Sequence, residues 1–265
     1  MLKGFLKERF LDLGLYYQIN GYRFRNDQRN ASQKEFYGQL IGKDDLVFDI
    51  GANVGQRSEI FSQLARQVIA FEPQPDCVRH LKSRFRRTPN VTINQLAVSD
   101  SEGEATFFKS DSHTLSSMSP EFISKVSAHR FKESHWNEQL VVTTTTLDHM
   151  IARYGVPRFI KIDVEGFEAN VLKGLTQPVS YISFEMTPEL IEQSQECVRL
   201  LNSISPDYVF NYCVGEDLNF VLKEHADYEE FTGHILPKLG KQGHFGDIYA
   251  VLSQSKNARA SAVTS

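Results

Sequence analysis

A glycine-containing loop near the start of the sequence has the composition of a ligand-binding turn. The segment FDIGANVG, residues 48–55, joins the apolar run LVFDI to a stretch with helical spacing. Gly51 and Gly55 let the backbone approach a ligand closely, because glycine has no Cβ atom. In an open parallel sheet, ligands bind at the carboxyl ends of the strands. Asp49, near the end of the apolar run, could pair there with a cationic amino group of the ligand.

The same loop argues against a dinucleotide ligand. The dinucleotide fingerprint GxGxxG provides bare backbone for the pyrophosphate. Counted from Gly51, this sequence has Asn53 where the second glycine belongs and Gln56 where the third belongs. A nucleoside that carries methionine has no phosphate and needs neither glycine. The loop therefore favours S-adenosylmethionine over NAD.

An acidic residue ends the next apolar run. Glu72 stands in AFEP, 21 positions after Gly51, within the predicted strand 68–73. An acid at this place can accept hydrogen bonds from both hydroxyls of a ribose. The alternative is an acid that caps the helix beginning near Pro73. Together with the glycine loop, the position favours ribose binding.

Charged residues interrupt a later apolar run, FIKIDVEGFE, at residues 159–168. Buried charge is unfavourable unless it is paired or serves a function. Lys161, Asp163 and Glu165 are therefore candidates for an ion pair or a functional role. Asp163 falls at the carboxyl end of a strand predicted to lie beside the first one, which places it near a transferred methyl group. For Glu168 we prefer a structural interpretation, favourable charge in the first turn of a helix.

Three carboxylates are candidates for removing a proton from an acceptor. An alcohol is a poor nucleophile while protonated, so a base within hydrogen-bond reach helps. Asp163 is the first candidate, with Glu165 and Glu185 as alternatives, and each could instead hold acceptor hydroxyls. Together they could bind a hard divalent ion, but such carboxylates also occur without metal, and we assign no metal site. A histidine of the region 109–140 could also serve as base, although a surface position is the simpler interpretation.

Strands alternating with helices must position these residues. The predicted strands are 46–50, 68–73, 91–98, 99–108, 141–147, 158–164, 179–186, 208–214, 219–223 and 247–252. This order predicts an α/β fold with a mostly parallel, Rossmann-like sheet, an antiparallel C-terminal strand and helices on both faces. Residues 109–140 lack a clear period, so we expect an irregular insertion that acts as a functional loop or lid. Within it, Trp136 and Phe131 could form an apolar wall for a sugar or pack in a core.

The two ends of the chain look different from the rest. We expect a helical appendage at 1–43, an α/β domain at 44–252 and a disordered tail at 253–265. Apolar residues at helical spacing predict an amphipathic helix over residues 1–19. It could lie on a membrane surface, but packing on the domain or over the active site is the preferred interpretation.

Composition narrows the class of protein further. A net charge of −4 argues against a general nucleic-acid binder, which carries a basic field. Three scattered cysteines predict neither a disulfide framework nor a zinc site and fit a reducing cytoplasm. No apolar run approaches the roughly 20 residues that a membrane-spanning helix needs.

Five motifs in a fixed order resemble one enzyme family. DIGANVG, AFEP, LAVSDSEGEATF, VTTTTLD and FIKIDVEGFEANVLKG, within about residues 44–186, resemble the FkbM family of methyltransferases. The resemblance implies a class I methyltransferase fold, S-adenosylmethionine as donor, and O-methylation of a hydroxyl on a sugar, glycan or related natural product. It also implies donor-site residues: Asp49, Gly51, Asn53, Gly55 and Glu72, and against the adenine Leu96, Ala97, Val98, Ser99 and Asp100.

Other classes of function stay open as alternatives. A methyltransferase for nitrogen or nucleic-acid acceptors is disfavoured, because DVEG stands where the Asn/Asp-Pro-Pro-aromatic signature of amino-methylating enzymes would follow the fourth core strand. A catalytically silent binding module is disfavoured because Asp49, Gly51, Glu72 and Asp163 are all present. The expected partners are a small-molecule or glycan acceptor and no nucleic acid, and a homodimer is left open.

Overall fold

The computed structural model of the protein describes residues 28–216 and 218–253. The expected amphipathic helix at 1–19 lies outside these residues, and so does all but the first residue of the expected tail. Among the described residues, no helix combines the length and the apolar character that crossing a membrane requires.

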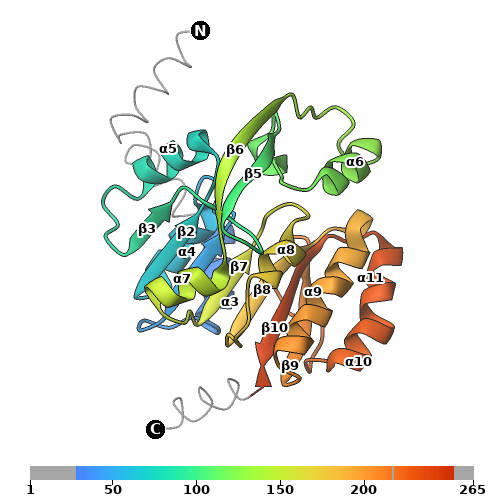
Figure 1. The fold of residues 1–265 in the computed structure, drawn as a ribbon. Helices are drawn as coiled ribbons and strands as arrows, with labels where there is room; N and C mark the ends of the chain where they lie inside the picture. Colours follow the sequence, from blue (N-terminus) through green and yellow to red (C-terminus); the bar gives the residue numbers. More distant parts are fainter. Residues whose placement is uncertain (1–27, 217, 254–265) are drawn as a thin grey trace.

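A seven-stranded sheet forms the centre of the fold, in the order β3-β2-β1-β7-β8-β10-β9 (Figure 1). In sheet order the strands are β3 (Val91–Asn94), β2 (Gln67–Phe71), β1 (Leu46–Ile50), β7 (Phe159–Ile162), β8 (Tyr181–Met186), β10 (Gly246–Leu252) and β9 (Tyr208–Val214). The first five pair in parallel, and β10 is antiparallel to both of its neighbours. The predicted α/β class, with a mostly parallel sheet and an antiparallel C-terminal strand, is confirmed.

Helices cover both faces of the sheet. Successive residues of a strand point to opposite faces, so that each strand contributes apolar side chains to two cores. Phe48 and Ile50 of β1 join a core with α7, α8, α9 and α11, whereas Val47 joins a core with α3 and α4 on the other face. The helices of the first face are α7 (Leu147–Tyr154), α8 (Glu168–Lys173), α9 (Ile191–Ile204), α10 (Tyr228–Glu230), the π-helix η3 (Phe231–Ile235) and α11 (Leu236–Gln242). Those of the second face are α3 (Gln28–Gly38), α4 (Gln56–Leu64) and α5 (Pro75–Arg84).

The described part of the N-terminal segment is integrated into the domain. Tyr37 of α3 is fully buried, and its ring packs edge-on against Phe61 of α4 and Phe159 of β7. Leu40 and Ile41 belong to the same core. The boundary that we expected at residue 43 therefore does not mark an edge of the hydrophobic core.

The strand order reverses at β1. The chain places β2 and β3 successively on one side of β1 and then returns to place β7 on the other side. Ligands of open α/β sheets bind outside the carboxyl ends of the strands at such a reversal. The fold thus brings the residues that follow β1, β2 and β7 to one edge of the sheet.

Two strand predictions are wrong. The expected strand 91–98 divides into β3 and β4 (Ala97–Val98), because β4 leaves the main sheet and pairs with β6 (Glu138–Thr145). Together with β5 (Gly103–Lys109) they form a separate sheet of order β4-β6-β5. The expected strand 219–223 does not form: the Asn211 side chain bonds both the amide and the carbonyl of Leu222, at 3.0 and 2.9 Å, and takes the place of strand pairing at that residue.

The expected irregular insertion is partly helical. It contains η1 (His113–Leu115) and α6 (Pro120–Ala128), and Figure 1 shows α6 beyond β5 and β6, at one end of the main sheet. Phe122 and Val126 of α6 are fully buried in a small apolar cluster that Phe131 and Trp136 pack against. Trp136 also donates a hydrogen bond to the Leu115 carbonyl at 2.7 Å. Both aromatic residues therefore pack in this local core, as in the second interpretation given above, core packing in place of an apolar wall for a sugar.

Candidate functional site

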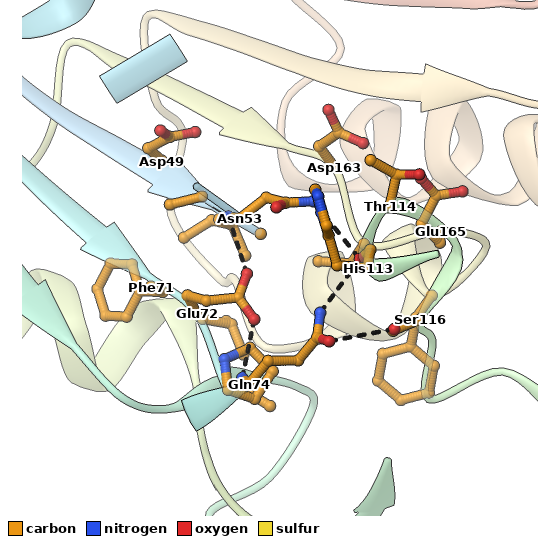
Figure 2. A pocket seen from close by; sticks show the side chains of 18 of the residues that line it. Asp49, Asn53, Phe71, Glu72, Gln74, His113, Thr114, Ser116, Asp163 and Glu165 are labelled. Atoms are coloured by element: carbon orange, nitrogen blue, oxygen red, sulfur yellow. Dashed lines mark hydrogen bonds between the residues drawn. The ribbon is translucent and has the colours of Figure 1, made fainter. Parts of the chain in front are cut away.

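A pocket lies at the carboxyl ends of β1, β2, β7 and β8, where the strand order reverses. Asp49, Glu72, Asp163 and Glu185 line it, each from a different one of these strands or the residue directly after it. Figure 2 shows Glu72 on one side of the pocket and Asp163 with Glu165 on the other. The carboxylates named from the sequence are thus brought to one site.

The two glycines of the loop have different roles. Gly51 lines the pocket with φ +79°, and a Cβ atom there would collide with the carbonyl oxygen of Asp163. Gly55 is not a lining residue. It adopts φ +84° and lies against α5, so that a Cβ atom would come within 2.6 Å of Phe85 and 2.8 Å of Leu81. Gly51 therefore allows strand contact at the site, whereas Gly55 allows helix packing behind it.

Glu72 is buried and held by backbone donors on both sides. The amide of Asn53 donates to its Oε2 at 2.8 Å, and the amide of Gln74 donates to its Oε1 at 2.8 Å (Figure 2). Burial raises the pKa of Glu72 to about 7, although these backbone donors favour the charged form. Its contact with Gln74, directly before α5, also gives it part of the capping role that we considered. The carboxylate is fixed in place and titrates near neutral pH.

Asp49, in β1, lines the same pocket. It is buried and accepts a short hydrogen bond from the Ser58 hydroxyl of α4. Burial raises its pKa to about 6. A cationic group of a ligand beside Asp49 would stabilise its charged form, and the pairing with such a group stays a prediction.

The stretch expected against an adenine lies only partly in the pocket. Leu96, Ala97 and Val98 line it, together with the aromatic rings of Phe71 and Phe107. Ser99 and Asp100 are not lining residues. These apolar side chains provide a surface suited to a flat, weakly polar ring.

The candidate bases form a tight cluster. Asp163, Glu165 and Glu185 each offer a carboxylate oxygen, and these atoms all lie within 4.8 Å of one another. Burial, followed by the charge of the neighbouring carboxylates, raises the pKa of both Glu165 and Glu185 well above the usual range. The Glu185 Oε2 atom is buried and has no hydrogen-bond partner. The cluster can accept a proton or hydroxyl donors, and its oxygen ligands also suit a divalent ion.

Glu165 is held in an unusual backbone conformation. Its φ is +53°, in the left-handed region that residues with a side chain rarely adopt. The Ser117 hydroxyl, from the insertion, donates to its carbonyl at 2.6 Å. Glu168 accepts from the amides of Val164 and Gly166, at 3.2 and 3.1 Å, and so fixes the same turn. Glu168, the first residue of α8, thus has the structural role that we preferred.

A buried ion pair behind the cluster was not found from the sequence. The Lys161 Nζ atom lies 2.9 Å from Asp247 Oδ1 and 3.3 Å from Asp163 Oδ2, and Lys161 is 1% exposed. Burial alone would lower the pKa of Lys161, but the charges of Asp163 and Asp247 outweigh it and raise this pKa. Lys161 stood out as a charge in an apolar strand, whereas Asp247, 86 residues later, gave no signal of its own.

The insertion covers part of the pocket. His113, Thr114, Ser116 and Met118 are lining residues. The Gln74 side chain donates to the His113 carbonyl at 3.2 Å and accepts from the Ser116 hydroxyl at 3.2 Å (Figure 2). These residues bring the insertion, with one of its histidines, to the pocket, and its role as a lid stays a prediction.

Comparison with known proteins shows the family of the chain. The family model described as "Methyltransferase FkbM domain" matches residues 49–243. The chain belongs to the FkbM methyltransferase family. The resemblance inferred from the motifs is thereby confirmed, and the matched range includes the glycine loop, Glu72 and all three carboxylates of the cluster.

The relatives of this FkbM domain share limited sequence identity with it or cover only part of its length. The hexuronic acid methyltransferase AglP of Haloferax volcanii is 30% identical over 145 residues, which are 54% of each chain. A probable ribosomal RNA small subunit methyltransferase A of Methanosarcina barkeri is 36% identical over 95 residues, 35% of this chain and 32% of that one. The chain thus spans about half and about a third of the length of these curated relatives. An FkbM methyltransferase structure from Methylobacillus flagellatus KT has a TM-score of 0.47 and 14% identity, covering 90% of this chain and 60% of that one.

A further ion pair lines the pocket of this FkbM domain. Arg57, in the first turn of α4, lies 3.2 Å from Glu216, which follows β9, and both line the pocket. Neither residue was named from the sequence, because only the fold brings α4 and the end of β9 together.

Proposed function

We propose that the protein is an S-adenosylmethionine-dependent O-methyltransferase that acts on a hydroxyl of a sugar, glycan or related natural product. The observation that carries this proposal is the placement of Glu72 and the three-carboxylate cluster on opposite sides of one pocket at the β1/β7 reversal. Membership of the FkbM family supports methyl transfer. The name of the relative AglP, a hexuronic acid methyltransferase, supports a sugar acceptor.

The pocket offers a place for each part of the donor. Glu72 would accept hydrogen bonds from the ribose hydroxyls, and Ala97 and Val98 would contact the adenine. Asp49 would pair with the amino group of the methionine part. Gly51 and Asn53 would let the backbone of the loop follow the ligand, and Asp163 would lie near the methyl group. These residues together form the proposed donor site.

The chemistry requires little beyond positioning and a proton acceptor. When bound, S-adenosylmethionine supplies a methyl group already activated on a sulfonium, so that attack by an oxygen releases a neutral thioether. The protein's part is to hold the acceptor oxygen in line and to take its proton. Asp163 is our first choice of base, because it ends β7 beside β1. Glu165 and Glu185 remain the alternatives.

The choice of base has a direct test. Asp163→Asn keeps the shape of the side chain but cannot accept the proton, so we expect kcat to fall about 10²- to 10⁴-fold. Because Asp163 also lies in the proposed donor site, kcat is measured at saturating S-adenosylmethionine, so that a change in donor affinity does not contribute. The measurement is transfer of labelled methyl from S-adenosylmethionine to a panel of glycosides, with the methyl ether identified by NMR. Full turnover by Asp163→Asn would reject Asp163 as the base, and label found in RNA or on an amine would reject the proposed acceptor class.

Donor affinity should depend on pH through Glu72. The pKa of this carboxyl is raised to about 7 by burial, and only its ionised form can accept both ribose hydroxyls. We therefore expect affinity to rise about tenfold between pH 6 and pH 8 in calorimetric titrations of the wild-type protein. Glu72→Gln is the matched control, since its amide does not titrate. An equally steep rise in Glu72→Gln would assign the pH dependence to another group.

A further inference from the structure

The pocket lining contains one residue with a permanent positive charge, Arg57. Within the described part of the chain, the other ionisable lining residues are carboxylic acids and one histidine, His113. Arg57 stands in the first turn of α4, directly after the loop that joins β1 to this helix. Its side chain is 19% exposed, so the guanidinium lines the pocket while it is largely shielded from water. A cation at this depth requires an anionic partner.

Arg57 lies beside Asp49. The next residue of α4, Ser58, donates a short hydrogen bond to the Asp49 Oδ2 atom, so Arg57 and Asp49 line the pocket at neighbouring places. Burial raises the pKa of Asp49 to about 6, and the charge of Arg57 is among the influences that oppose this rise. The pocket thus presents a negative and a positive side chain next to each other.

The donor of the proposed function carries two opposite charges at one end. In its methionine part the ammonium and the carboxylate are attached to the same carbon atom, so the groups that bind them must be neighbours. If Asp49 pairs with the ammonium, Arg57 is the side chain of fitting charge next to it. A guanidinium binds a carboxylate through two parallel N–H groups, and the amino-terminal turn of a helix favours an anion. Arg57 combines both features.

Arg57 is engaged by a carboxylate of the protein itself. Its Nη2 atom lies 3.2 Å from Glu216 Oε2, and Glu216 stands in the turn that follows β9. The Glu216 side chain is 55% exposed, and an ion pair with an exposed partner contributes little to stability. A ligand carboxylate can therefore displace Glu216 from the guanidinium without a large loss of stability.

We propose that Arg57 binds the α-carboxylate of the S-adenosylmethionine donor and that Glu216 competes with this carboxylate for Arg57. The guanidinium then selects ligands with an intact amino-acid end, while Glu216 limits their affinity. This inference rests on the proposed function, because it assumes that the pocket holds the donor with its ammonium at Asp49. It adds to Asp49 and Glu72 a third charged contact, which recognises the only anionic group of the donor.

Two ligands that differ in one group test the assignment without any methyl transfer. Decarboxylated S-adenosylmethionine lacks the α-carboxylate and keeps the ammonium and the sulfonium. In calorimetric titrations at pH 8, we expect the wild-type protein to bind S-adenosylmethionine at least about 30-fold more tightly than the decarboxylated ligand. Arg57→Met, which keeps the apolar stem of the side chain, should reduce this ratio to about threefold or less. Arg57→Lys should give an intermediate ratio, since it keeps the charge but lacks the paired N–H groups.

Two further variants complete the experiment. Glu216→Gln removes the competing carboxylate and should bind S-adenosylmethionine several-fold more tightly, whereas its affinity for the decarboxylated ligand should not rise. Arg199→Met is the matched control. This exposed arginine of α9 pairs with Glu196 at 2.7 Å and does not line the pocket, so both affinities should equal those of the wild-type protein.

The outcomes separate this inference from the proposed function. An equal ratio in the wild-type protein and Arg57→Met would overturn the role of Arg57. If Arg57→Met does not fold, Glu216→Gln decides, because an unchanged or weaker affinity for S-adenosylmethionine excludes competition for Arg57. Binding of neither ligand by the wild-type protein would reject the proposed function and this inference with it. Binding of both ligands with equal affinity would reject the role of Arg57 alone.

Discussion

Gly51→Ala is expected to destabilise the protein by about 3 kcal/mol or more and to abolish donor binding. Gly51 has φ +79°, and the new methyl group would collide with the backbone carbonyl of Asp163, which cannot rotate away as a side chain could. Relief of the collision would separate β1 from β7 at the point where both contribute to the pocket. Unfolding in denaturant and titration with S-adenosylmethionine measure the two effects.

The matched control for this prediction is Gly233→Ala. A Cβ atom on Gly233 meets no atom within 4 Å. Its backbone lies in the π-helix η3, so the free energy of unfolding should change by less than about 1 kcal/mol. A Gly51→Ala protein as stable as Gly233→Ala, with donor affinity retained, would show that the β1 loop does not approach β7 as described.

Lys161→Met should destabilise the protein by about 3–5 kcal/mol, the usual effect of removing one partner of a buried ion pair. Asp247 would remain buried without its cation, and Asp163 would lose the neighbour that lies 3.3 Å from its Oδ2. Because an unpaired carboxylate can be neutralised by taking up a proton, the loss should be larger at pH 8 than at pH 5. Denaturant unfolding at the two pH values provides the measurement.

A double variant distinguishes lost charge pairing from lost packing. Lys161→Met combined with Asp247→Asn removes both charges of the buried pair, so it should be more stable than Lys161→Met alone. Equal instability of the two variants would assign the effect to packing. Wild-type stability of Lys161→Met would contradict the account of Lys161 as the cation that compensates the cluster.

Much of the site was predictable because it depends on short-range patterns. The strand 46–50 was predicted with its observed bounds, and Asp49, Glu72 and Asp163 could be placed because each stands at the carboxyl end of an apolar run. Parallel strands bring such ends to one edge of a sheet, whatever the details of the packing. The approximate geometry of the pocket therefore follows from strand order alone.

The features that were missed depend on contacts between distant segments. Asp247 faces Glu185 only through the antiparallel pairing of β10 with β8, a register that the sequence of β10 does not specify. Gly55 looked equivalent to Gly51 because both stand in one loop, and only the packing of Phe85 separates their roles. The segment 219–223 does not form a strand, and the Asn211 side chain bonds both backbone polar groups of Leu222, a contact between distant residues that the sequence does not specify.

The proposed function requires that this pocket binds S-adenosylmethionine with Glu72 on the ribose. Calorimetric titration of the wild-type protein and of Glu72→Ala with S-adenosylmethionine tests it most directly, with NAD as the control ligand. We predict an affinity on the order of micromolar for S-adenosylmethionine, no binding of NAD, and at least about 30-fold weaker binding by Glu72→Ala. Absence of S-adenosylmethionine binding by the wild-type protein would reject this pocket as the donor site, and equal binding by Glu72→Ala would reject Glu72 as the ribose ligand.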